Sequence, residues 1–500
     1  MATALPETGQ SSLRRHAIGV PGIVFFVVAA AGPLAASVAT APVVFATAGS
    51  SAPLAYVIVG AVLLLFAMGY AAMSRFVTGA AGLAAYVEAA SNRRVGTAAA
   101  FTAMVSYSAV LFGLYGGFGY FTGYVAETYL GVTAPWWLWS GIALVLVAVF
   151  GYLEINLSAK VLGVLMVCEV AIIILFDVVV FVVGGPEGRS LAGLNPAALA
   201  EAPALGLGLL FAAVAFLGFE ATAIYGEEAK DPERSIPRAT YVAVGLITGF
   251  YTVTMLALSV AYGDSGVVAA AEANPAGFVL EANTEFVGTL ATDIATALVI
   301  TSYFAAILAL HNTLSRYVLS LGRTGALPGV LARTHHRFQS PHIASLVGTA
   351  LSLLAVVAAV SLGLDPFAQL FAWLTGLGTI GIFCLQAAAS VAVVLYFRRD
   401  RRGVSAWNAV VAPALAAVAI AIIVYLAVSN WGVLSGAVDG YAVYLPVVIP
   451  VAAVAGLMVA TVRGDALGSL QSQLGPDSRH HASQALISGL SPDESQADSR

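Results

Sequence analysis

Three carboxylates lie inside apolar stretches of the chain that are long enough to cross a membrane. Glu220 follows the run FAAVAFLGF, and Glu169 and Asp177 lie within VLGVLMVCEVAIIILFDVVVFVV. A charged side chain at the centre of a bilayer costs about 2.5 to 3.5 kcal/mol on insertion scales. Such a group is a candidate for function by default, and proton uptake and release is chemistry that a carboxyl group offers there.

Each carboxylate has a functional and a plainer interpretation. Removal from water disfavours the charged form of a carboxyl group, so Glu220 is expected to load and release a proton. Glu169 would carry a proton or pair with a cationic group, and Asp177 lies about two helical turns further along the same face. Alternatively, Glu220 bonds the free N–H groups of a broken helix, and Glu169 reaches the interface or pairs with a neighbouring span. We predict all three as proton-coupling residues.

Two apolar stretches are interrupted by helix-breaking residues. Gly32-Pro33 falls within VVAAAGPLAASVATAP, and Gly218 falls within AFLGFE beside Glu220. Proline removes a backbone donor, and freed backbone groups in a membrane are tolerated only where they face protein or a water-filled cavity. A simple proline kink is the alternative for the first stretch. Interruptions at matching positions in two halves of a chain are typical of a transporter binding site.

Broken helices offer complementary groups to a ligand. The N-terminal end of a half-helix suits a carboxylate, and the free carbonyls of a C-terminal end suit an ammonium group, so a zwitterionic amino acid matches both. Tyr107, in a third apolar stretch, is expected to line the same cavity, although it fits a packing role as well. The residues that we predict to bind substrate are Ala31, Gly32, Pro33, Leu34, Ala35, Phe216, Leu217, Gly218, Phe219 and Tyr107.

Composition indicates a polytopic α-helical membrane protein. Hydrophobic residues make up 60% of the 500 residues and charged residues 9%, whereas a soluble domain carries roughly 25% charged residues. The alternating pattern of a β-barrel is absent. Reading for runs of about 20 apolar residues gives twelve expected spans. Their limits are 20–46, 54–76, 97–125, 135–153, 159–184, 204–226, 237–262, 287–317, 342–363, 367–397, 405–428 and 442–462.

The distribution of charge predicts the orientation. With a cytoplasmic N-terminus, nearly all Arg and Lys fall in inner segments and the outer loops hold Arg189 alone, as the positive-inside rule requires. Both termini are then cytoplasmic, and we expect a multi-pass protein of the plasma (inner) membrane. The polar residues 1–16 and 464–500 are expected to be disordered.

The sequence gives little sign of a cofactor, a metal or a nucleic acid. Cys168 and Cys384 lie in apolar runs without metal-ligand spacing, and the glycine-rich run GLYGGFG has neither a preceding strand nor a following Lys. His311 is a further candidate proton group, with a packing role as the alternative. We therefore expect no cofactor, no metal and no nucleic-acid partner, and the oligomeric state stays open.

Three segments resemble one known family. GFEATAIYGEEAKDPERSIPRAT resembles the sixth-span signature of the amino acid–polyamine–organocation (APC) permease superfamily. HNTLSRYVLSLGRTGALPGVLARTHHRFQSPHIA resembles its eighth-span exit, and LSAKVLGVLMVCEV the start of its fifth span. The resemblance implies twelve transmembrane helices in a five-plus-five inverted-repeat (LeuT-like) fold with helices 1 and 6 discontinuous. The repeats would be residues 17–184 and 204–397, with 405–462 peripheral.

The resemblance also carries expectations for the site. Many family members bind the substrate carboxylate through a G-x-G triplet, where this chain has Pro33, Leu34 and Ala35, a form that some amine or polyamine transporters resemble. Family members implicate a Glu at the position of Glu220 in proton or substrate sensing. Some sodium-independent members place a Lys at the position of Glu169.

We therefore expect a secondary active transporter, not an enzyme, that takes up an amino acid or a related amine by alternating access with proton coupling. An exchanger is the alternative. Sodium coupling, which would draw on groups such as Ser302, and a non-transporting nutrient sensor are further readings. A membrane enzyme would need clustered His, Asp or Ser groups at one membrane face, and the sequence has none. The sequence does not name the substrate.

Overall fold

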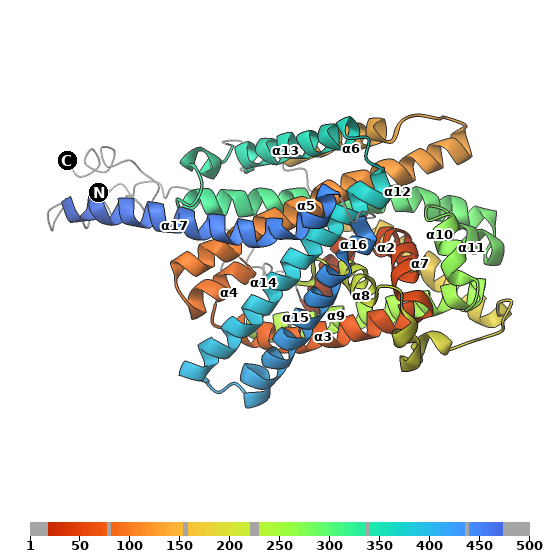
Figure 1. The fold of residues 1–500 in the computed structure, drawn as a ribbon, viewed down its shortest axis with the longest axis horizontal. Coiled ribbons are helices and arrows are strands. Elements are labelled where there is room, and N and C mark those ends of the chain that lie inside the picture. Colours follow the sequence, from red (N-terminus) through yellow and green to blue (C-terminus); the bar gives the residue numbers. More distant parts are fainter. Residues whose placement is uncertain are drawn as a thin grey trace, which may run out of the picture.

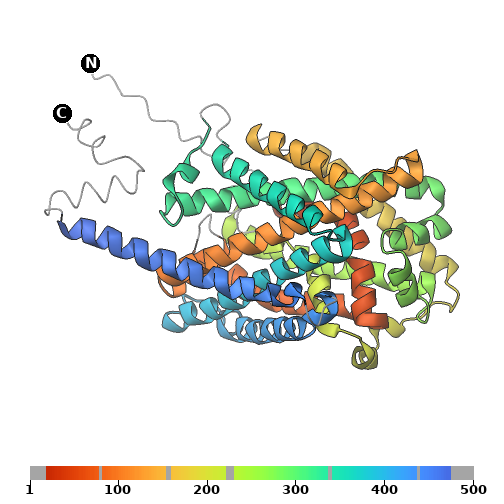
Figure 2. The same cartoon turned by 45° about the horizontal axis from the view of Figure 1, so that its top comes forward.

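The computed structural model describes residues 19–77, 82–153, 159–220, 230–335, 340–435 and 440–473. Within these ranges helices, joined by turns and irregular segments, form the regular structure, and Gly185 and Gly188 form an isolated bridge. Long helices run in roughly one direction and form an elongated bundle (Figure 1). Helix α17 extends beyond its neighbours at one end, and the short helices α10 and α11 lie at the other (Figure 2).

The first half of the chain contains seven α-helices among the described residues. Their bounds are α1 (Val20–Ala31), α2 (Pro33–Ala48), α3 (Ala52–Met73), α4 (Leu83–Ala90), α5 (Arg93–Leu130), α6 (Trp136–Leu153) and α7 (Ala159–Val183). The side chain of Asn92 accepts a hydrogen bond from the Val95 N–H at 3.1 Å and so caps α5. Gly131, with a φ of 64°, ends the same helix in the left-handed conformation that glycine adopts freely.

The second half also contains both long and short helices. Its bounds are α8 (Leu205–Val214), α9 (Pro232–Tyr262), α10 (Val267–Ala273), α11 (Phe278–Phe286), α12 (Thr289–Arg323), α13 (His342–Ser361), η6 (Pro366–Phe371), α14 (Ala372–Arg399), α15 (Ala412–Ser429), α16 (Trp431–Ser435) and α17 (Val448–Gln473). Asp365 caps η6 by accepting hydrogen bonds from the N–H groups of Phe367 and Ala368 at 2.9 and 2.6 Å.

Among the described residues, ten helical stretches are long and apolar enough to cross a membrane, whereas the sequence predicted twelve spans. The difference has two causes. The stretch Pro33–Met73, which joins α2 and α3, counts once. The expected span 204–226 supplies only α8, which ends at Val214 and is too short to cross by itself.

The first expected span is divided at Gly32. Helix α1 ends at Ala31 and α2 begins at Pro33, and Gly32 between them has a φ of 55° and a ψ of 70°. That left-handed conformation is strained for residues other than glycine. Pro33 fits the first helical position because the N–H that it lacks would have no intrahelical partner there. The interruption therefore follows from the residue pair that the sequence singled out.

The second interruption lies after α8. Residues 215–218 form turns, with Gly218 at a φ of 103°, and residues 219–220 begin a 3-10 turn. The helix expected to continue to residue 226 thus ends at Val214, because glycine at a positive φ cannot propagate an α-helix. Residues 221–229, which include the first three residues of the polar cluster expected between Glu227 and Arg238, lie outside the described residues.

Two polar segments that the sequence indicated as a loop and a disordered tail contain helix. Asp231 and Arg234 form an exposed ion pair at 3.8 Å at the start of α9, which is local to that helix. Helix α17 continues to Gln473, past residue 464 where the sequence indicated a disordered tail.

Helix α7 has one face toward the bundle and one toward its surroundings. Its exposed apolar residues recur at helical spacing, namely Val164, Val167, Ile174, Val178 and Val182. The opposite face carries Glu169 and Asp177, each only 4% exposed. An exposed apolar face on a long helix is expected where lipid surrounds the protein. This packing turns both carboxylates inward.

Candidate functional site

A buried carboxylate occupies the first interruption. The Glu169 Oε2 accepts hydrogen bonds from the Leu34 N–H at 3.3 Å and from the Ser302 hydroxyl at 2.8 Å. The Ser302 Oγ in turn lies 3.4 Å from the Ala35 N–H that donates to it. These groups come from α7, α2 and α12, and we call them the Glu169 cluster.

The Glu169 cluster satisfies the positive end of α2. A helix leaves its first N–H groups without intrahelical partners and carries a partial positive charge there. Pro33 has no N–H, so Leu34 and Ala35 supply the first donors of α2, and both are bonded within the cluster. The protein's own carboxylate therefore lies where the sequence placed recognition of a substrate carboxylate. Gly32 packs closely against the cluster, because a Cβ added to it would lie 3.1 Å from the Ser302 Oγ.

A second buried carboxylate occupies the second interruption. The Glu220 Oε2 accepts a hydrogen bond from the Gly218 N–H at 3.1 Å, and its Oε1 accepts one from the Tyr107 hydroxyl at 2.6 Å. The Tyr70 hydroxyl donates to the backbone carbonyl of Glu220. We call these residues the Glu220 cluster. It links α3 and α5 to the turns that follow α8.

The two clusters lie at different levels of the bundle. Tyr107 packs against Tyr317 of α12 with ring centroids 5.8 Å apart, whereas the Glu169 cluster contacts α12 at Ser302. Ser302 and Tyr317 are about four turns apart on that helix, which is about 22 Å along its axis. The predicted residues thus form two separate groups and do not surround one common site. The Glu220 cluster is the one nearer the end of α12 that carries Arg323.

Asp177 belongs to neither cluster. Its Oδ2 accepts a hydrogen bond from the Thr254 hydroxyl of α9 at 3.0 Å, and its buried Oδ1 has no hydrogen-bond partner within the described residues. Tyr251, one turn before Thr254 on α9, also has a buried hydroxyl without a hydrogen-bond partner in the described part of the chain. The region between α7 and α9 therefore contains, besides the bonded pair Asp177 and Thr254, the Asp177 Oδ1 and the Tyr251 hydroxyl.

The other predicted binding residues lie around the two interruptions. Ala31 is the last residue of α1. Phe216 and Phe219 are buried, Phe219 meeting the edge of Phe66 at 5.8 Å, and Leu217 is half-buried. Phe216, Leu217 and Phe219 belong to the non-α segment that follows α8.

Some residues of the two clusters were not predicted. Tyr70 belongs to the Glu220 cluster and Tyr317 packs against its Tyr107, and the only sequence signal for either is a phenol within an apolar run. His311 lies apart from both, where its Nε2 and the Ser345 Oγ are 2.8 Å from each other beside Gly151 and Gly348. Within the described residues, no group of three or more His, Cys, Asp or Glu could hold a metal ion.

The apolar helices, the two interruptions and the buried carboxylates define a multi-pass membrane protein. A family model described as "Amino acid permease" matches residues 18–454, and the chain belongs to this family within the APC superfamily. The resemblance noted in the sequence is thereby confirmed.

Curated relatives carry transporter names. An uncharacterized transporter of Mycobacterium tuberculosis is 31% identical over 166 residues, 33% of this chain and 36% of the relative. A branched-chain amino acid permease of Bacillus subtilis is 26% identical over 260 residues, 50% of this chain and 49% of the relative. A methylthioribose transporter of the same species is 30% identical over 183 residues, which are 35% of this chain and 36% of the relative. The chain thus spans half or less of the length of these relatives.

Proposed function

We propose that the protein is a proton-coupled secondary active transporter that takes up an amino acid or a related amine across the plasma membrane by alternating access. One observation carries this proposal. At each of the two interruptions, a backbone N–H next to the break is bonded by a buried carboxylate, Leu34 by Glu169 and Gly218 by Glu220. The state of protonation of these carboxylates then decides how firmly each break is held.

The first step concerns Glu169. A charged carboxylate binds the positive end of a helix through charge-assisted hydrogen bonds, which are about twice as strong as neutral ones. When Glu169 takes up a proton, this attraction weakens and the N–H group of Leu34 becomes available to a substrate carboxylate. Proton and substrate therefore bind together, as symport requires.

The second step concerns Glu220. Its carboxylate joins the Tyr107 hydroxyl of α5 to the Gly218 N–H at the second break. Protonation of Glu220 on the inner side would loosen that link and let the segment after α8 move away from α5. We assign Glu220 to the opening of the inner gate and Glu169 to the loading of substrate. Asp177, about two turns closer to the outer end of α7, would pass protons to Glu169.

The proposal includes the finer architecture expected from the family. The interrupted pair α1–α2 and the broken segment that starts with α8 would be the first and sixth of twelve spans in two inverted repeats of five, residues 17–184 and 204–397. Residues 405–462 would be peripheral. Both termini, residues 1–16 and 464–500, would face the cytoplasm.

Substrate choice follows from the same chemistry. An amino acid needs the N–H groups of α2, so its uptake should rise as Glu169 is protonated. An amine without a carboxylate would instead bind the charged form of Glu169, so its uptake should fall. The relative named as a branched-chain amino acid permease makes branched-chain amino acids the first substrates to try.

Uptake into vesicles reconstituted with the purified protein tests the function. We expect leucine, or the amino acid that most raises thermal stability in a ligand screen, to accumulate when the outside is acidic. Accumulation that depends on substrate already inside, and is indifferent to the proton gradient, would mean exchange. Binding without any uptake would mean a sensor. Either result would contradict the proposal.

A further inference from the structure

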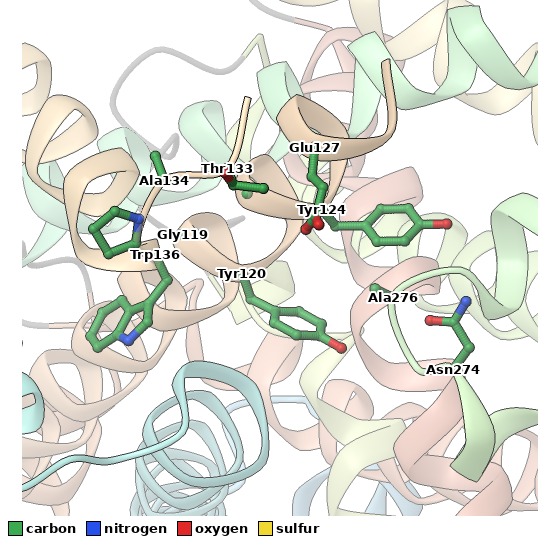
Figure 3. A pocket seen from close by; sticks show the side chains of 11 residues that line it. Gly119, Tyr120, Tyr124, Glu127, Thr133, Ala134, Trp136, Asn274 and Ala276 are labelled. Carbon is green, nitrogen blue, oxygen red and sulfur yellow. The ribbon is translucent and has the colours of Figure 1, made fainter. Parts of the chain in front are cut away.

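A cavity of about 470 Å³ lies at the end of the bundle opposite the projecting end of α17. The last turns of α5, the connection from α5 to α6, and the segment between α10 and α11 form its walls. Figure 3 shows Tyr120 and Tyr124 pointing across the space toward the segment that carries Asn274 and Ala276, with the Glu127 carboxylate beside Tyr124.

The lining has the character of a site for an organic cation. Tyr120, Tyr124 and Trp136 present aromatic rings, Glu127 supplies a carboxylate, and none of the described lining residues is Lys or Arg. Rings attract cations through the negative charge of their faces. A second carboxylate lies next to the lining residues: Glu281 accepts a hydrogen bond from the Asn274 Nδ2 at 2.6 Å.

The walls are held in place before any ligand arrives. Tyr120 stacks on Phe367 with centroids 4.9 Å apart and planes 15° from parallel, and Asp365 fixes Phe367 at the start of η6. Asn274 is held from two sides, by Glu281 and by the Gly277 N–H, which donates to its Oδ1 at 3.1 Å. Because these contacts already fix the side chains, binding loses less conformational entropy here than at a mobile surface.

A row of packed aromatic rings runs from this cavity toward the Glu169 cluster. Phe121 lies 5.3 Å from Tyr120 and 5.5 Å from Tyr303, measured between ring centroids. Tyr303 is the residue next to Ser302 on α12, and its buried hydroxyl has no hydrogen-bond partner within the described residues. The rings thus lead from the cavity toward the first interruption.

We propose that this cavity is a separate binding site for an organic ammonium ion, which holds the amino group of the substrate at the outer mouth before it reaches the Glu169 cluster. The outer position of the site rests on the proposed function. Its chemistry rests on the lining residues alone. The cavity selects against anions and against neutral molecules of the same shape.

Binding of tetramethylammonium to the full-length protein tests the site. Saturation-transfer NMR in micelles of an uncharged maltoside detergent detects the bound probe, and tert-butanol serves as a neutral probe of similar shape. We expect Tyr124→Leu to weaken tetramethylammonium binding about tenfold and Tyr124→Phe to preserve it, because the ring provides the attraction. Glu127→Gln should weaken binding several-fold. Glu201→Gln, an exposed change outside the cavity, should not.

The outcomes separate this site from the transport mechanism. Equal affinity in Tyr124→Leu and the wild type, or binding of tert-butanol as tight as that of tetramethylammonium, would overturn the site. Glu169→Gln should leave tetramethylammonium binding unchanged. If the wild type takes up no substrate while the cavity variants still lose binding, the proposed function fails and the site stands.

Discussion

The carboxylate of Glu169 accepts a hydrogen bond from the backbone N–H of Leu34 at 3.3 Å, although the two residues are 135 positions apart in the sequence. The contact fastens α7 to the positive end of α2. It also fills the position where a substrate carboxylate was expected to bind. In the proposed mechanism, substrate and Glu169 compete for the Leu34 N–H, and a proton on Glu169 decides the competition.

Replacing Ser302 by Ala tests how the Glu169 cluster is held. The change removes the hydroxyl that donates to Glu169 and accepts from Ala35. Hydrogen bonds between membrane helices contribute about 1 kcal/mol, so thermal stability should fall and the pH dependence of uptake should shift. Ser37→Ala is the matched control, because its buried hydroxyl bonds the Pro33 carbonyl of its own helix. An equal shift of the pH profile in both variants would refute a special role for Ser302.

Replacing Tyr107 by Phe tests the Glu220 cluster. The loss of the 2.6 Å hydrogen bond leaves Glu220 with a weaker hold on α5. We expect Tyr107→Phe and Glu220→Gln to change the pH dependence of uptake in the same direction, because both weaken the same link at the second break. Tyr115→Phe, also buried on α5, should transport normally. If Glu220→Gln keeps the wild-type pH profile, Glu220 takes no part in proton coupling.

Replacing Gly32 by Ala tests the first interruption. A side chain at a φ of 55° costs about 1 to 2 kcal/mol, and here its Cβ would also lie 3.1 Å from the Ser302 Oγ. Lower thermal stability and slower uptake should follow. Gly245→Ala on α9 is the control, because a Cβ there meets no atom within 4 Å among the described residues. Comparable losses in the two variants would show that the conformation of Gly32 is not special.

Replacing Asp177 by Asn tests its role as a proton donor to Glu169. Asp177 touches neither interruption, so substrate affinity should be unchanged while the maximal rate of proton-driven uptake falls several-fold. Thr254→Val removes the hydroxyl that bonds Asp177 and keeps the carboxylate. A wild-type rate for Asp177→Asn, or a loss no greater than that of Thr254→Val, would leave Asp177 with a structural role only.

The interruptions were predictable because their signals are local. Gly32-Pro33 and Gly218 are helix breakers within apolar runs, and the backbone departs from helix at both places. The partners of the carboxylates were not predictable. The Glu169–Leu34 and Glu169–Ser302 contacts depend on how α2, α7 and α12 pack, and no local pattern records that packing.

Helix lengths show the same division between local and tertiary information. The run from 97 to 125 was recognised as a span, but α5 reaches from Arg93 to Leu130 because caps outside the apolar run set its ends. The plainer reading of Glu220, a carboxylate that bonds free N–H groups, agrees with its contact to Gly218. That contact is also what makes proton binding matter to the break, so both readings describe the same arrangement.

Proton influx that accompanies substrate entry tests the central claim most directly. A pH-sensitive dye inside vesicles would report protons while labelled substrate reports uptake, for the wild type, Glu169→Gln and the exposed control Glu201→Gln. We predict coupled influx in the wild type and the control, and substrate equilibration without proton influx in Glu169→Gln. Wild-type proton influx per substrate in Glu169→Gln would contradict the account.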